Sequence, residues 1–159
     1  NLQVTALDPG HVARHCKVGR WDSSDGLDLA YVRCYDASNR DLDSPFALSY
    51  HNARAVYGAV NPPKYFAYLW NLPGVPGTSS FNSVGAPNVV SGQTLVFEGV
   101  GHAQTHLQVT GYGTTPAYCQ PTQPWIVDGV SVIAKDVLCF SATGVPAASP
   151  FLATTASSG

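Results

Sequence analysis

The chain has 159 residues, of which 45% are apolar and only 11% are charged, and its formal net charge is −2. This apolar fraction is enough for a packed core, and the length fits one domain of ordinary size. The low charge excludes a basic surface of the kind that binds nucleic acid, and no apolar run approaches the ~18–20 residues needed to cross a bilayer. Four cysteines in a chain without methionine favour a secreted protein that matures in an oxidising compartment.

Short runs with two-residue apolar alternation, separated by turn clusters, predict an all-β fold. We expect an antiparallel sandwich or barrel of about ten strands with internal pseudo-symmetry. In chain order the expected strands are Leu2–Ala6, His15–Arg20, Leu27–Tyr35, Phe46–His51, Tyr65–Trp70, Asn88–Val90, Thr94–Gly99, Thr105–Tyr112, Val130–Phe140 and Phe151–Thr155.

The first third of the chain recurs in its last third, at offsets of 103 to 105 residues. Leu2-Gln3-Val4-Thr5-Ala6 returns as Leu107-Gln108-Val109-Thr110-Gly111, Cys16 as Cys119, Trp21 as Trp125, Val32-Arg33-Cys34 as Val137-Leu138-Cys139, and Ser44-Pro45-Phe46 as Ser149-Pro150-Phe151. We therefore divide residues 1–159, a single β domain, into an N-terminal copy (1–51), a middle segment that occurs once (52–105) and a C-terminal copy (106–159). A half repeat would expose an unpaired strand edge and an apolar face, so we expect the two copies to pack against each other.

Each copy holds one pair of cysteines that brackets a tryptophan and an Asp-Gly turn signal. This order predicts the disulfides Cys16–Cys34 and Cys119–Cys139, each joining the two arms of a hairpin. Asp25-Gly26 and Asp128-Gly129 are the expected turns. The paired cysteines are 18 and 20 positions apart, a spacing that does not fit a zinc ribbon.

Histidines recur with His-x-x-x-His spacing at His11 and His15 and again at His102 and His106. On a strand such residues lie ~13 Å apart, too far to bind one ion, so we interpret them as ordinary surface or turn histidines.

The densest carboxylates are Asp22, Asp25 and Asp28. Their spacing partly fits a calcium loop but lacks a closing bidentate Glu, and an Asp-Gly hairpin turn explains them as well. We expect no metal and no cofactor, with calcium at these aspartates as the likeliest exception.

Alternation along Tyr65–Trp70 places Phe66, Tyr68 and Trp70 on one face of a strand. Such aromatic rings either pack in a core or form a platform on which a ligand stacks. Taking them as candidate binding residues, we predict a binding module that recognises a neutral carbohydrate, a peptide or a protein surface.

Two alternatives stay open. One is a small secreted hydrolase that uses Glu98, His102 and His106, although the chain has no Gly-x-Ser-x-Gly elbow. The other is a secreted protease inhibitor that presents the Pro-bounded loop Leu72–Thr78. A function without catalysis is favoured because no convergent catalytic set is evident, and the sequence does not define the oligomeric state.

Several blocks carry a resemblance to known proteins. They are Leu2–Ala6, Cys16–Trp21, Val32–Ala37, Asp43–Tyr50, Tyr65–Trp70, Phe81–Ser83 and Gly92–Gly99. In this order they resemble repeats of secreted β-rich proteins from actinobacteria and myxobacteria. The resemblance implies a secreted bacterial protein and carries over no catalytic residue. The C-terminal copy departs from the pattern, with Gln120-Pro121 in place of Lys17-Val18 and Phe140-Ser141 in place of Tyr35-Asp36.

Overall fold

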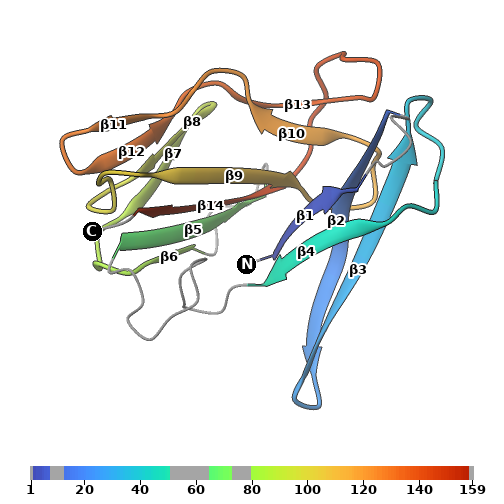
Figure 1. The fold of residues 1–159 in the computed structure, drawn as a ribbon, viewed down its shortest axis with the longest axis horizontal. Coiled ribbons are helices and arrows are strands. Elements are labelled where there is room, and N and C mark those ends of the chain that lie inside the picture. Colours follow the sequence, from blue (N-terminus) through green and yellow to red (C-terminus); the bar gives the residue numbers. More distant parts are fainter. Residues whose placement is uncertain (1, 8–12, 51–64, 73–79, 158–159) are drawn as a thin grey trace.

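A computed structural model describes residues 2–7, 13–50, 65–72 and 80–157. These residues form fourteen strands and no helix, which confirms the all-β prediction (Figure 1). The strands are β1 (Leu2–Ala6), β2 (Arg14–Ser24), β3 (Leu27–Asp36), β4 (Phe46–Tyr50), β5 (Tyr65–Asn71), β6 (Ser80–Asn82), β7 (Asn88–Ser91), β8 (Thr94–Phe97), β9 (His106–Gly111), β10 (Tyr118–Pro121), β11 (Ile126–Asp128), β12 (Ser131–Ala134), β13 (Val137–Phe140) and β14 (Phe151–Ser157). Within this part of the chain, no helix is long and apolar enough to cross a membrane.

The strands pair antiparallel in several sheets that do not close into a barrel. Two sheets are four-stranded, with the orders β6-β5-β14-β9 and β11-β12-β8-β7. The other sheets are the pairs β1-β4, β2-β3 and β10-β13. In Figure 1 the two four-stranded sheets form one body, and the β2–β3 hairpin projects away from it.

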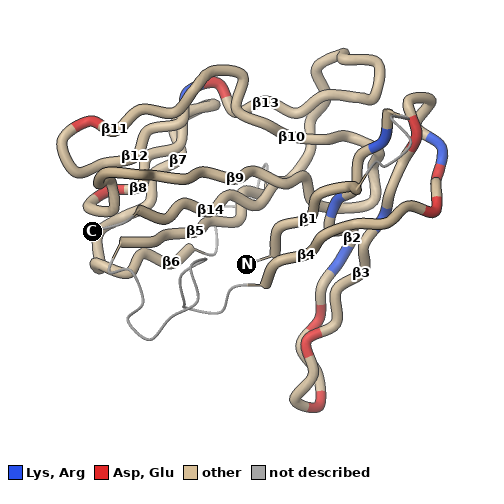
Figure 2. Tube along the Cα trace, in the orientation of Figure 1, with Lys and Arg blue, Asp and Glu red and all other residues tan. Residues whose placement is uncertain are grey.

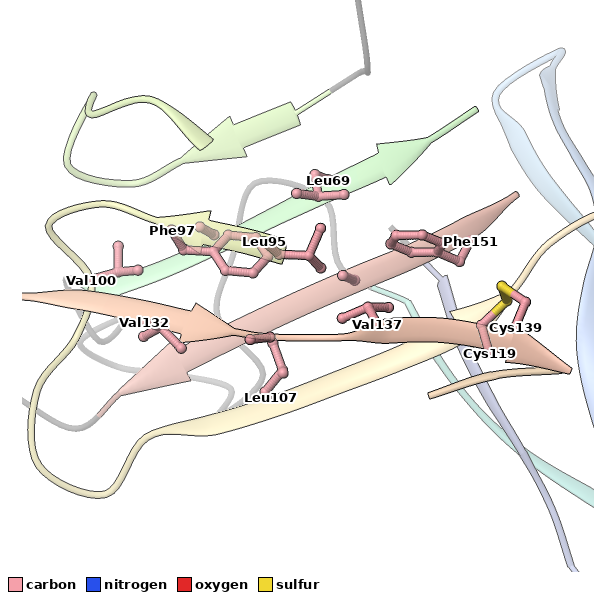
Figure 3. Packing of buried hydrophobic residues seen from close by; sticks show 13 residues of the cluster. Leu69, Leu95, Phe97, Val100, Leu107, Cys119, Val132, Val137, Cys139 and Phe151 are labelled. Carbon is pink, nitrogen blue, oxygen red and sulfur yellow. A yellow bond between two sulfur atoms is a disulfide. The ribbon is translucent and has the colours of Figure 1, made fainter. Parts of the chain in front are cut away.

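The main core fills the space between the two four-stranded sheets and β10-β13 (Figure 3). Alternation sends Ala67 and Leu69 of β5 into it from one sheet, and Leu95 and Phe97 of β8 from the other. Its other buried members are Val100, Leu107, Cys119, Val132, Ala134, Val137, Cys139, Phe151 and Ala153. The core thus joins the middle segment to the C-terminal copy.

Strand pairing in the N-terminal copy recurs in the C-terminal copy 105 positions later. Leu2 lies opposite Tyr50 between β1 and β4, and Leu107 lies opposite Thr155 between β9 and β14. Loop hydrogen bonds recur with the same offset: Leu7 N–Pro45 O with Tyr112 N–Pro150 O, Asp36 N–Arg40 O with Ser141 N–Val145 O, and Leu42 N–Cys34 O with Ala147 N–Cys139 O. Residues 105 positions apart therefore occupy equivalent places in these two parts of the fold.

The middle segment completes only the C-terminal copy. β5 pairs with the edge of β14 that faces away from β9, and β8 pairs with the edge of β12 that faces away from β11. In the N-terminal copy, β4 pairs only with β1 and β3 only with β2 among the described strands. Two strand edges that β5 and β8 cover in the C-terminal copy thus have no described strand beside them in the N-terminal copy.

The two copies also contact each other, as expected. Val18 of β2 forms a parallel bridge with Tyr112, and its carbonyl accepts a hydrogen bond from Gly113 N at 2.8 Å. The Val4 N–H donates to Thr110 Oγ1 at 3.4 Å. The contacts between the copies nevertheless leave Phe46, Leu48 and Tyr50 of β4 exposed.

Both predicted disulfides are present, Cys16–Cys34 and Cys119–Cys139, and in each the cysteines lie directly opposite one another on paired strands. The turn at Asp25-Gly26 has a positive φ at both residues, as a type I′ hairpin requires. In the C-terminal copy, Asp128 pairs with Ser131, so the central turn residues are Gly129-Val130 and not Asp128-Gly129.

The prediction of one strand over Val130–Phe140 is wrong. β12 and β13 belong to different sheets, because the chain leaves β8 after Ala134 and then pairs with β10. Asp136, between them, has a φ of 52°, which breaks the extended conformation. The short strands β6, β10 and β11 are absent from the strands expected from the sequence.

Candidate binding cleft

The inner face of β4 carries Phe46, Leu48 and Tyr50. Cross-strand partners lie on the same side of a sheet, so this face continues onto Leu2 and Val4 of β1. Leu2 and Val4 are buried against Cys16, Val18 and Cys34 of the β2–β3 hairpin. The three β4 side chains extend beyond that small core.

The equivalent residues of β14 are buried. Phe46 is 44% exposed and Phe151 6%, Leu48 is 42% exposed and Ala153 0%, and Tyr50 is 42% exposed and Thr155 0%. Leu48 and Tyr50 are larger than Ala153 and Thr155, but the phenylalanine is the same in both strands. The strands also differ in their neighbour: β5 lies along β14, whereas no described strand lies along the outer edge of β4.

The opposite wall of the cleft is the projecting part of the β2–β3 hairpin. The Cys16–Cys34 disulfide joins the two arms at the base of this hairpin, where both cysteines belong to the small core, and the tip, residues 22–31, is exposed. Trp21 packs edge-on against Trp70 at 6.3 Å between ring centroids, which anchors the hairpin where it leaves the body. The hairpin therefore faces β4 across an open space.

That space is a cleft of about 180 Å³ with a largely apolar lining. Its lining residues are Leu2, Trp21, Asp22, Asp28, Leu29, Ala30, Leu48 and Tyr50. The cleft thus lies between β4 and β3, each of which has one edge that no described strand covers, and its lining is mostly apolar.

Two carboxylates, Asp22 and Asp28, lie within this apolar lining, and Asp28 contacts β4. Asp28 accepts hydrogen bonds from the Ser23 and Tyr50 hydroxyls, which lower its pKa below the ordinary value. The same contact raises the pKa of Tyr50. Asp28 is therefore ionised at neutral pH and links the hairpin to β4.

The predicted calcium residues, Asp22, Asp25 and Asp28, belong to the projecting β2–β3 hairpin, on which Figure 2 shows carboxylate residues in red. Asp22 forms an ion pair with Arg20 at 3.0 Å, and Asp28 has the partners named above. In the described part of the chain, no group of three or more His, Cys, Asp or Glu side chains could hold a metal ion.

Phe66, Tyr68 and Trp70 are on one face of β5, but they do not form one open surface. Phe66 is 6% exposed and stacks on Phe81 at 5.4 Å between ring centroids. Trp70 packs against Tyr112 at 4.9 Å and belongs to the small core, while Tyr68 is half-buried beside Phe81. Their role in binding a ligand stays a prediction.

The hydrolase candidates lie at the other end of the body. His102 stacks on Tyr65 at 3.6 Å between centroids and lines a shallow depression whose lining includes neither Glu98 nor His106. The ring of His106 meets Trp125 edge-on at 6.4 Å. Their use in catalysis stays a prediction. In the inhibitor loop, residues 73–78 lie outside the described residues, as does His11.

His15 lies between the two copies. Its Nε2 is 2.7 Å from Pro116 O, and its ring is 5.4 Å from the rings of both Tyr35 and Tyr118. Burial lowers the pKa of His15, so the imidazole is neutral at physiological pH and acts as a packing element here.

Lys17 was not among the predicted site residues, yet it is fully buried at the junction of the copies. Its ammonium donates to Thr115 O at 3.0 Å, Ala117 O at 2.9 Å and Ser149 Oγ at 3.1 Å. Burial lowers the pKa of Lys17 to about 8. The available signal was a lysine between Cys16 and Val18, within an expected strand.

The residues of the cleft were also missed as a site. The signal was the half repeat itself, which predicts an uncovered edge and apolar face.

The two disulfides indicate an extracellular or otherwise oxidising environment. No protein-family model matches the chain, and no curated protein or solved structure is significantly similar to it.

Proposed function

We propose that this protein is a secreted binding module that recognises an extended segment of another polypeptide at the cleft between β4 and the β2–β3 hairpin. The observation that carries the proposal is the exposed inner face of β4. Phe46, Leu48 and Tyr50 stand open around an apolar cleft, although the same positions are buried in the C-terminal copy.

The strand edges favour a polypeptide as the ligand. An extended peptide that adds to a sheet gains main-chain hydrogen bonds, and pockets for its alternate side chains provide specificity. The cleft supplies both elements, because the uncovered edges of β4 and β3 flank apolar side chains. Large exposed apolar patches on soluble proteins commonly mark such interaction sites.

Selection from a library of displayed random decapeptides tests this function. We expect the wild-type chain to enrich peptides with alternating apolar residues, and Leu48→Arg to bind the enriched peptides at least tenfold more weakly. Leu48 is exposed, so the substitution places a charge in the cleft without disturbing a core. Val145→Arg is the matched control, since Val145 is also exposed and does not line the cleft.

Two results would contradict the proposal. One is the absence of enriched peptides. The other is equal binding of the enriched peptides to the wild type and to Leu48→Arg. If cellohexaose or chitohexaose instead binds and shifts the resonances of Tyr68 and Trp70, carbohydrate recognition on β5 takes its place.

A further inference from the structure

We infer that the cleft accepts two β-strands of another polypeptide. One strand extends β4 and the other extends β3, and their apolar side chains alternate as in β5 and β8. The inference rests on the proposed function and names the class of partner. It starts from the C-terminal copy, where the equivalent strands already have such partners.

The first partner strand is the equivalent of β5. In the C-terminal copy Leu69 lies beside Ala153, and Ala67 lies beside Thr155. Ala153 and Thr155 correspond to Leu48 and Tyr50, 105 positions earlier. A β5-like strand in the same register therefore places a leucine beside Leu48 and covers the exposed face of β4.

The second partner strand is the equivalent of β8. Phe97 lies beside Val132, and Leu95 lies beside Ala134, where β8 pairs with the edge of β12 that faces away from β11. Counting from the hairpin turns, Val132 and Ala134 correspond to Asp28 and Ala30, because Ser24–Leu27 and Asp128–Ser131 are the pairs that flank the two turns. The edge of β3 is therefore the expected place for a β8-like strand.

On the edge of β3 that would pair with the second strand, one difference between the copies determines which partner residue is preferred. Asp28 stands where the C-terminal copy has Val132, so the position that Phe97 occupies beside Val132 faces a carboxylate in the N-terminal cleft. Asp28 is exposed in this structure and accepts hydrogen bonds from the Ser23 and Tyr50 hydroxyls. A partner strand that covers it removes water from its charge, and a facing cation offsets that cost. The preferred partner therefore carries Lys or Arg at the place of Phe97 and stays apolar at the place of Leu95.

A synthetic peptide with the sequence of Tyr65–Asn71 and a short Gly-Ser extension at each end tests the first strand. Calorimetry with the full chain should give a Kd on the order of micromolar, as small interfaces do. Leu48→Arg should weaken binding at least tenfold, and Val145→Arg should leave it unchanged. A scrambled peptide of the same composition, in which the alternation is lost, should not bind.

The register is checked with a nitroxide on the C-terminal extension of this peptide. In β14 the residue beside Asn71 is Phe151, the equivalent of Phe46. The nitroxide should therefore broaden the NMR signals of Phe46 more than those of Tyr50. Stronger broadening of Tyr50 would mean the opposite strand direction and would overturn the proposed pairing.

The sequence Asn88–Phe97 tests the second strand and its specificity. The peptide with Phe97→Lys should bind the wild-type chain about tenfold more tightly than the parent peptide, and added salt should reduce this preference. In the Asp28→Val chain the preference should reverse. If the Asp28→Val chain still prefers the Phe97→Lys peptide to the same extent, Asp28 does not determine which residue binds at this position.

The outcomes separate this inference from the proposed function. If neither peptide binds while library peptides still depend on Leu48, the polypeptide-binding function stands and the β5- and β8-like partner is wrong. If the binding of every peptide is unaffected by Leu48→Arg, both the proposed function and this inference are wrong.

Discussion

Phe151→Ala is expected to lower the free energy of unfolding by about 3–5 kcal/mol, the usual cost of emptying a buried phenylalanine site. Phe151 lies in the main core between β5 and β9. The cavity borders Leu69 and the Cys119–Cys139 disulfide (Figure 3), and neighbours held by a disulfide can move little to fill it.

Phe46→Ala is the matched substitution at the equivalent position. Because Phe46 is exposed, we expect a loss of less than about 1 kcal/mol, as for most surface substitutions, together with weakened binding of peptides at the cleft. Urea unfolding of both variants, followed by tryptophan fluorescence, measures the difference. Similar losses of stability in the two variants would mean that Phe46 is covered in solution and that the cleft is closed.

Lys17→Met is expected to lower the free energy of unfolding by about 2 kcal/mol at pH 7. Methionine fills the volume, but Ala117 O loses a donor in a buried place, and an unsatisfied buried acceptor costs about 1–3 kcal/mol. Thr115 O, which is only partly buried, also loses this donor. The loss is moderated because the substitution also removes the cost of burying a charge.

The effect of Lys17 should depend on pH. Its pKa is about 8 in the folded chain against an ordinary value of 10.5, so between these values the unfolded chain binds more protons than the folded one. Stability from this group therefore rises with pH across that window. The wild type should gain about 2 kcal/mol over Lys17→Met between pH 7 and pH 9.5, from the linkage relation.

Urea titrations of both proteins at the two pH values measure this change as a difference between chains, which removes the contribution of other groups. His15 titrates below the window because burial lowers its pKa, and Tyr35 titrates above it because burial raises its pKa. If the difference in free energy of unfolding between the two proteins stays constant with pH, Lys17 has its ordinary pKa in the folded chain. If the difference becomes smaller as the pH rises, folding raises the pKa of Lys17 instead of lowering it.

The amino-acid pattern by itself determined the local structure of this protein. Alternation predicts strands because successive side chains point to opposite faces, and it located most of the longer ones. Matched Cys-Trp-turn-Cys orders predicted both disulfides, since a hairpin brings the cysteines opposite one another. Asp25-Gly26 predicted a turn because a type I′ turn needs two residues that tolerate positive φ.

Tertiary structure decided which of these elements are covered. Phe46 and Phe151 occupy the same place in the same local pattern, yet only Phe151 is buried, because β5 reaches β14 and not β4. Lys17 looks like a surface residue and is buried because the C-terminal copy supplies three oxygen acceptors. Alternation specifies which way a side chain points, but burial depends on what lies opposite, and that is set by contacts between segments far apart in the chain.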